Sequence, residues 1–202
     1  MIAVESFASG RPRLRASSED IYQFIDGGLR HPDRRIRKRF LRSAAAAAQG
    51  ISENACVTSI VATLFSGCSE MFVLGCYFDR DASADSLLET HAYDWLALQF
   101  GSDVAELVRL QFSARRFLST VIPQYFPRLA LAHQREVFGG GGFMNPFEKQ
   151  VFTESPFYLR ALAIVRWLEQ ANEGRVDIPD IEFFMVFLEL GMERAERRGL
   201  LS

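Results

Sequence analysis

The chain has 202 residues, of which 49% are hydrophobic and 24% are charged, a balance typical of a folded globular protein rather than a disordered one. Its formal net charge is -2, so nucleic acid is not an expected partner, and the basic run 34–39 is interpreted as a solvated helix face rather than a phosphate-binding patch. The longest apolar stretches, such as 71–78, are far shorter than the roughly 20 residues of a membrane helix, so no membrane association is predicted.

Almost every segment carries a helical pattern, with turn residues between the segments. Apolar residues at helical spacing predict a first helix from Ile21 to Leu29. A second is expected from Asp33 to Gln49, because its run of five alanines favours helix and Gly50 favours a stop. Between 57 and 72 the apolar residues recur on one face, which predicts a central buried helix.

After a polar break at 79–86, two further helices are predicted, Leu87–Phe100 and Val104–Leu118. The glycine run 139–142 is not followed by the Lys-Ser/Thr of a phosphate loop, so it is interpreted as a mobile loop. The remaining helix signals are a cap at Asn145 with Pro146 and Glu148, a start at Ser155–Pro156 with an end near Asn172, and a last helix after 178–180 that ends in Arg194, Arg197 and Arg198.

These elements predict an all-α protein with one domain, a single helical bundle over 19–202 preceded by an arm over 1–18. Residues 1–15 contain no apolar segment of the kind found in signal peptides, so a cytoplasmic location is expected. Cys56, Cys68 and Cys76 are odd in number and lack CxxC spacing, which favours reduced thiols in the core over disulfides or zinc ligands.

One predicted helix combines apolar and polar residues on the same face. Val104, Val108, Gln111 and Arg115 follow one another at helical spacing, so Gln111 and Arg115 are expected to point inward. An inward guanidinium needs a partner, because a buried unpaired charge costs several kcal/mol. Two interpretations remain open: Arg115 pairs with an internal carboxylate or reaches the surface, or it binds an anionic ligand in a pocket.

Several segments together resemble HD-domain oxygenases that cleave organophosphonates, which are relatives of myo-inositol oxygenase. The resemblance rests on the segments 91–96, 108–118, 125–129, 165–167 and 178–182, and it is most specific in the C-terminal half. It implies an all-helical HD-domain bundle. It also implies a mixed-valent diiron centre that activates oxygen against a small phosphonate or a related polar substrate.

The ligands of that diiron centre are mostly missing from this sequence. By the resemblance, the His-Asp doublet falls at Ser66-Gly67, the next histidine is replaced by Gln111, and an aspartate is replaced by Leu168. Only His91 keeps its histidine, and the chain has three histidines in all. One imidazole cannot hold a diiron pair, so no metal and no cofactor are expected.

Two arginines stand at other positions of the family's site. The resemblance assigns the first histidine loosely to Arg42, although helical phase puts Arg42 opposite the face of Ile36, Phe40 and Ala44. It assigns the substrate-binding lysine to Arg115, so a cation remains where the phosphonate group would lie.

The chain has 18 phenylalanines, and most are expected in the core. An apolar refilling of the metal cavity, or an exposed aromatic patch that binds a partner, are the alternatives. The relevant set around the expected pocket is Phe112, Phe117, Phe126, Phe138, Phe143, Phe147, Phe152 and Phe157.

The sequence therefore predicts an HD-like protein without a diiron centre that acts as a ligand-binding, regulatory or partner subunit. The candidate ligand-binding residues are Arg115, Gln111, His91 and Ser66, for a small anionic or partly apolar ligand. No catalytic residue is assigned, and His91 is interpreted as a structural histidine rather than a general base. The alternatives are a divergent oxygenase-like or hydrolase-like enzyme with an altered or absent metal, and a structural module that forms a homodimer or binds another protein.

Overall fold

A computed structural model describes residues 15–67, 84–172 and 178–199, and for 84–91 and 172 it describes the backbone alone. Within these ranges every regular element is a helix and no strand occurs, which confirms the predicted all-α class. The division into an arm and one domain stays a prediction. The elements are α2 (Ser18–Leu29), α3 (Arg34–Ser52), α4 (Val57–Leu64), the 3-10 turn η1 (Phe65–Gly67), α6 (Ala84–Phe100), α7 (Ser102–Val121), α8 (Tyr125–Arg128), α9 (Leu131–Gly139), α10 (Pro146–Glu154), α11 (Tyr158–Asn172) and α12 (Ile181–Gly199).

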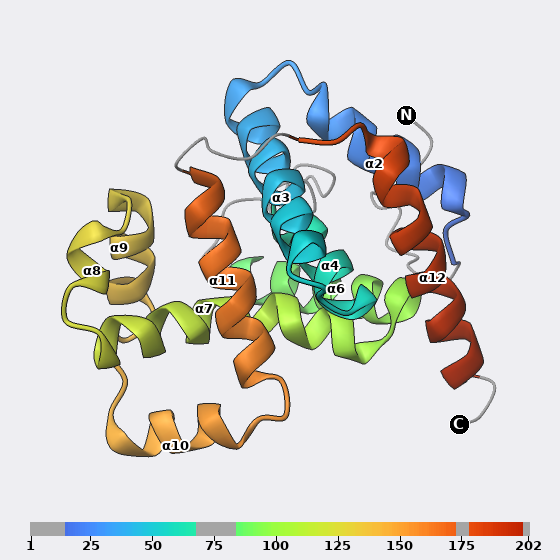
Figure 1. Cartoon of the computed structure of the whole chain (residues 1–202). Coiled ribbons are helices and arrows are strands. Elements are labelled where there is room, and N and C mark those ends of the chain that lie inside the picture. The colour runs from blue at the N-terminus through green and yellow to red at the C-terminus, as the bar shows by residue number, and fades with distance from the viewer. Residues whose placement is uncertain (1–14, 68–83, 173–177, 200–202) are drawn as a thin grey trace.

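The helices pack around α3, α4 and α7. Figure 1 shows α3 between α11 on one side and α12 on the other, with α7 crossing beneath them. Contacts join α7 to α4, α6 and α11, and α11 also packs on α3. The short helices α8 and α9 project at one edge, beside the C-terminal end of α7. The candidate site lies where α3, α7, α9 and α11 approach one another.

The predicted capping signal at Asn145 is confirmed. The Asn145 side chain accepts a hydrogen bond from the Glu148 backbone N–H, and the Glu148 carboxylate accepts one from the Asn145 N–H. Ser17 and Asp20 form the same reciprocal pair at the start of α2. Each pair satisfies backbone donors that a helix N-terminus leaves without partners.

The predicted stop at Gly50 is wrong, because α3 continues to Ser52. Gly50 is needed for packing instead: a Cβ there would lie 3.1 Å from the Trp167 ring. The left-handed residue that ends the helix is Asn54, at φ 57, and the Ala55 N–H donates to the Gly50 carbonyl. Asparagine tolerates this conformation better than most residues.

The central helix is shorter and more deeply buried than predicted. It ends at Leu64 and tightens into η1, and every residue from Thr58 to Leu64 is buried, so no single face can be distinguished. The predicted continuation from 68 to 72 lies outside the described residues. Gly101, at φ 89, alone separates α6 from α7, which is closer than the predicted break.

Two helices were not predicted, and one begins later than expected. α8 and α9 occupy a segment whose short apolar pattern gave no helical signal. Ser155 ends α10 rather than beginning α11, since its N–H donates to the Phe152 carbonyl.

The phenylalanines of the 112–157 set divide between the core and the surface, and Phe117 and Phe157 pack partly buried against the core. Of the set, Phe152 is buried, whereas Phe138, Phe143 and Phe147 are exposed. Phe126, Phe138 and Phe143 pack on one another at the surface, with ring centroids 5.1 to 6.3 Å apart. The aromatic core lies elsewhere and is formed by Phe24, Phe40, Phe65, Trp95, Phe100 and Phe184.

The prediction that Cys56 is a core thiol is also wrong. It is exposed, occupies the N-cap position of α4 without a side-chain capping bond, and its Sγ lies 3.3 Å from the Ser59 hydroxyl oxygen. Cys68 and Cys76 lie outside the described residues. In the part of the chain that the structure describes, no helix is long and apolar enough to cross a membrane.

Candidate functional site

The inward polar face predicted on α7 is confirmed. Val104, Gln111 and Arg115 are buried and Val108 is partly buried, and Arg115 is only 8% exposed. Alanine and leucine residues of the same helix pack into the core, which fixes its orientation. α7 therefore carries an amide and a guanidinium into the bundle.

Gln111 reaches the end of the central helix. Its Nε2 donates to the Ser66 hydroxyl at 2.7 Å, and that hydroxyl donates to the Ala62 carbonyl at 2.9 Å. Two candidate residues, 45 positions apart in the chain, are thus brought together. Each satisfies a polar group of the other away from water, which stabilises α7 against η1.

Arg115 lies between two carboxylates from different helices. Its Nη1 is 3.5 Å from an oxygen of Glu136 on α9, and its Nε is 3.5 Å from an oxygen of Glu169 on α11. The Glu136 side chain is 49% exposed, whereas that of Glu169 is 24% exposed. Arg115 thus adopts the first of the two predicted arrangements, a buried cation paired with carboxylates of the same chain.

Glu169 is the centre of this network. The Nδ1 of His133, a buried histidine on α9, lies 3.4 Å from the carboxylate oxygen that faces Arg115. Burial acts to raise the pKa of Glu169, but His133, Arg115 and Arg42 together hold it below its ordinary value. Glu169 is therefore ionised at neutral pH and links α11 to α7 and α9.

The position of Arg42 corrects the prediction from helical phase. Its Nε is buried, and its charge interacts with Arg115 and Glu169; burial and then Arg115 lower the pKa of Arg42. The phase argument failed because α3 becomes covered on all sides immediately after Arg42, where Ser43 to Ala47 are buried in succession. Arg42 thus faces Arg115 and Glu169, and its assignment to the family's first histidine stays a prediction.

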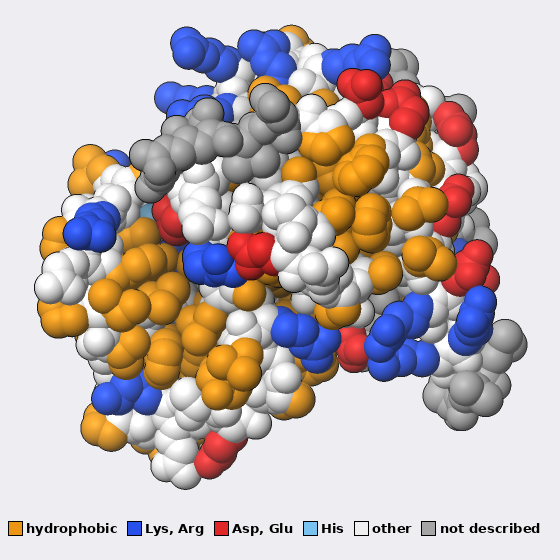
Figure 2. Space-filling model, viewed as in Figure 1, with side chains coloured by type: hydrophobic (Ala, Val, Ile, Leu, Met, Phe, Trp, Pro, Cys, Tyr) orange, Lys and Arg blue, Asp and Glu red, His pale blue; other side chains and the backbone are white. Residues whose placement is uncertain are grey.

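A groove leads from the surface to this network. It has a volume of about 480 Å³ and its walls are mainly apolar, with Leu118, Ile122, Tyr125, Leu159, Leu162, Ala163, Arg166, Glu169 and Gln170 as lining residues. In Figure 2 the hydrophobic side chains around α7, α8 and α11 form a broad patch on this face. Its volume is within the range of small-molecule sites. Arg115 does not line the groove but lies behind Glu169.

Two polar side chains of the groove differ in how they are satisfied. Arg166 is ion-paired with Glu53, and this contact holds the pKa of Glu53 at about 2. The Tyr125 hydroxyl is buried and has no hydrogen-bond partner among the described residues. Burial, with Glu169 nearby, raises the pKa of Tyr125, so the phenol stays protonated and is available as a donor.

The residues at the implied metal positions do not fit a diiron centre. Leu168 is fully buried and apolar, and Ser66 and Gln111 bond to each other. Arg42 and Arg115 place positive charge beside the Glu169 carboxylate, which opposes a cation there. Within the described ranges no group of three His, Cys, Asp or Glu side chains is arranged to hold a metal.

His91, the fourth candidate ligand-binding residue, cannot be placed relative to Ser66, Gln111 and Arg115. His91 falls in α6, but its side chain lies outside the described residues, so its role stays a prediction. Sequence reasoning did not assign roles to His133, Glu136, Glu169 or Tyr125. Glu169 follows Leu168 directly and Val165 by one helical turn, and this inward spacing was the signal that could have identified it.

Comparison with known proteins supports the resemblance over half of the chain. No protein-family model matches. Over 107 residues the chain is 32% identical to a hydroxymethylphosphonate dioxygenase of Gimesia maris, which covers 53% of each protein. Over 108 residues it is 30% identical to a 1-hydroxy-2-(trimethylamino)ethylphosphonate dioxygenase (glycine-betaine-forming) of Leisingera caerulea, which covers 53% of this chain and 55% of the relative. The chain thus spans about half the length of these curated relatives, and its similarity to phosphonate dioxygenases is confirmed over that part.

Proposed function

We propose that this oxygenase-like protein has lost the diiron centre and binds a small, partly apolar ligand as a regulatory or partner subunit. One observation carries the proposal: the Gln111 amide donates to Ser66 where the resemblance expects two metal ligands. The fully buried Leu168 removes a third ligand. Loss of several ligands from one centre removes its affinity for metal, since even single losses are costly.

The groove beside Glu169 is the proposed ligand site. Its apolar walls favour a short hydrocarbon body, and the Tyr125 hydroxyl favours a hydrogen-bond acceptor at the inner end. A buried donor without a partner costs about 1–3 kcal/mol, which an acceptor on the ligand would recover. A carboxylate or phosphonate on a short alkyl chain has both features. Its charge would lie near Glu169, where Arg115 and Arg42 offset the repulsion.

Metal content tests the first half of the proposal. Protein purified from medium supplemented with iron and manganese is expected to contain neither metal in stoichiometric amount by elemental analysis. Two irons per chain would refute the loss of the centre and would show that the positional assignments of Ser66, Gln111 and Leu168 are wrong.

Thermal shift assays test the second half, with hexanoate and butylphosphonate as probes. Both are expected to raise the unfolding temperature of the wild type. Tyr125→Phe removes one oxygen without changing the ring, and it should weaken binding roughly tenfold, the equivalent of about 1.4 kcal/mol. Leu162→Glu should abolish binding, because it puts a charge on the groove wall. A shift of equal size in all three proteins would exclude the groove.

Arg115→Ala distinguishes the two roles that the sequence left open for this residue. With Arg115 behind Glu169, its removal should lower stability more than it changes affinity for hexanoate. A loss of binding at least tenfold with unchanged stability would instead assign Arg115 to the ligand.

The alternative is a divergent oxygenase, and the two dioxygenase relatives are the observation that favours it. Oxygen consumption with hydroxymethylphosphonate as the probe separates the alternatives. Turnover that depends on added iron would support the enzyme, and its absence in metal-supplemented protein would support the binding role.

A further inference from the structure

The α11 wall of the groove divides into an apolar half and a polar half. The residues of α11 that line the groove are, in chain order, Leu159, Leu162, Ala163, Arg166, Glu169 and Gln170. The first three are apolar and the last three are polar. A ligand with an alkyl tail therefore places its head group against the second half of this wall, where two of the three side chains are charged.

The negative charge of Glu169 is already offset from behind the groove. Arg115 and His133 lie 3.5 and 3.4 Å from its carboxylate, and the charge of Arg42 interacts with it as well. None of these three side chains lines the groove. Arg166 does line it, three residues before Glu169 and about 4.5 Å from it along the helix axis. Arg166 thus supplies the positive charge that a ligand in the groove meets directly.

Arg166 is held at the rim of the groove by Glu53, which follows the C-terminal end of α3. Its Nη1 and Nη2 donate to the two oxygens of the Glu53 carboxylate, which also accepts from the Trp167 indole N–H at 3.0 Å. The Arg166 and Glu53 side chains are 49% and 31% exposed, so this ion pair is open to solvent. Exposed pairs contribute little net free energy, and a guanidinium has further N–H donors beyond the two that Glu53 accepts. Arg166 can therefore bind a second anion at low cost.

On the basis of the ligand site proposed above, we propose that Arg166 selects an anionic head group, and that Glu53 limits its affinity by competing for the same guanidinium. The Tyr125 hydroxyl, which lies near Glu169, donates to a charged or a neutral acceptor and so cannot make this distinction. Arg166 can, because its charge attracts a carboxylate more strongly than an uncharged amide. The preferred ligand is thus a short alkyl monoanion with its tail along the apolar half of the wall.

Hexanoate and hexanamide are the probes, because they share a chain length and a carbonyl acceptor but only hexanoate is charged. Their apparent Kd values follow from the dependence of Tm on ligand concentration. The wild type should bind hexanoate more tightly than hexanamide. Arg166→Gln should weaken hexanoate binding about fivefold, the upper end for an exposed ion pair, and leave hexanamide binding unchanged.

Glu53→Gln separates a role in binding from a role in structure. It breaks the same ion pair as Arg166→Gln, and glutamine still offers the Trp167 indole an acceptor. With its competitor removed, Arg166 should bind hexanoate about fivefold more tightly. The two variants should thus shift hexanoate affinity in opposite directions, whereas a mere loss of the contact between α3 and α11 would shift it in the same direction.

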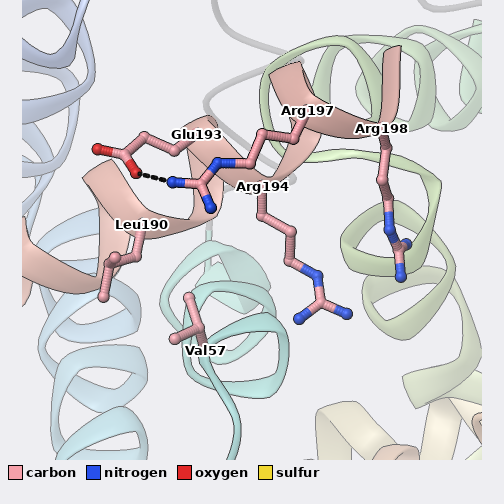
Figure 3. A pocket seen from close by; sticks show the side chains of 6 residues that line it. All are labelled: Val57, Leu190, Glu193, Arg194, Arg197 and Arg198. Carbon is pink, nitrogen blue, oxygen red and sulfur yellow. Dashed lines mark hydrogen bonds and ion pairs between the residues drawn. The ribbon is translucent and has the colours of Figure 1, made fainter. Parts of the chain in front are cut away.

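Arg194→Gln is the matched control for the loss of an arginine. Arg194 is an exposed residue of α12 and lines a separate hollow of about 370 Å³ beside Val57 and Leu190 (Figure 3). The same change there should leave the affinity for both probes unchanged. An equal loss of hexanoate affinity in Arg194→Gln and Arg166→Gln overturns the proposal, because the effect would then come from net charge alone.

The ratio of hexanoate to hexanamide affinity separates this proposal from that of the groove itself. A ratio that is the same in the wild type, Arg166→Gln and Glu53→Gln overturns selection by Arg166, and binding that Tyr125→Phe still weakens would leave the groove in place. If the wild type binds neither probe, both the groove and its selectivity are overturned.

Discussion

Glu169→Gln is the substitution that most directly tests the charged network. It keeps the size and the hydrogen-bonding capacity of the side chain but removes the negative charge that interacts with Arg42, Arg115 and His133. Arg115, with a side chain 9% exposed, would then keep only the contact with the half-exposed Glu136, which is more accessible to solvent. The variant should fold, with lower stability.

The expected decrease in the free energy of unfolding of Glu169→Gln lies between two typical values. Removing one partner of a buried ion pair costs about 3–5 kcal/mol, whereas exposed pairs contribute about 0.2–1 kcal/mol. The Glu169 side chain is one-quarter exposed and its contact with Arg115 is 3.5 Å, so we expect a loss of about 2–3 kcal/mol. For a chain of this length, about 2–4 °C per kcal/mol converts this into a decrease in Tm of about 4–12 °C.

The pH dependence of that loss has a defined sign. The pKa of Glu169 is lower in the folded protein than its ordinary value of 4.5, so its stabilisation is fully present above that value and is lost as the pH falls through the lowered pKa. The difference in Tm between wild type and Glu169→Gln should therefore be constant near neutral pH and shrink in acid. Thermal unfolding followed by circular dichroism at a series of pH values measures it.

Glu136→Gln is the matched control for this experiment. It removes a carboxylate at the same 3.5 Å distance from the same arginine, but from a side chain that is half exposed. Its cost should not exceed about 1 kcal/mol. Equal losses in the two variants, or a Glu169→Gln protein as stable as the wild type, would refute the assignment of Glu169 as the centre of the network.

Three further substitutions test local features of the fold and site. Gly28→Ala should destabilise the protein by about 1–3 kcal/mol, because its Cβ would overlap the Phe40 ring. Gly27→Ala meets no atom and should stabilise α2 by up to about 1 kcal/mol. Chemical denaturation measures both changes in the free energy of unfolding, and equal effects would contradict the packing of α2 on α3. Asn145→Ala should cost about 1 kcal/mol by removing the cap of α10, and an unchanged denaturation midpoint would argue against that cap. Gln111→His should restore neither stoichiometric iron nor oxygen consumption with hydroxymethylphosphonate, because Ser66 and Leu168 remain; recovery of either would show that more of the centre survives than we infer.

Most of the long helices and the inward face of α7 could be predicted because both depend on local spacing. The period that places Val104, Gln111 and Arg115 on one line is a property of a single helix, and burial of that face follows. The capping pair at Asn145 is likewise local, since its four residues are consecutive. Interactions of this kind are recorded directly in the sequence.

The partners of Arg115 could not be predicted, because they come from helices that only the tertiary fold brings together. Glu136 and Glu169 are 21 and 54 residues away; the spacing of Glu169 after Val165 could at most indicate that it points inward, and it does not indicate which side chain it meets. For Arg42 the local pattern gave a prediction, but that prediction was wrong. A period of 3.6 residues predicts which side of a helix is buried only when one side is buried, and α3 is surrounded.

The composition of the network explains why the implied centre would not be recovered one residue at a time. A guanidinium is permanently protonated and offers only donors, so Arg42 and Arg115 can neutralise Glu169 but cannot coordinate iron or exchange electrons. Changing Gln111 alone leaves both cations beside the carboxylate, and removing one cation alone leaves Glu169 less well neutralised in a low-dielectric interior. Each single step toward a metal site therefore costs stability before any metal affinity is gained. The network thus stabilises the packing of α3, α7, α9 and α11, and it opposes formation of the implied centre by single substitutions.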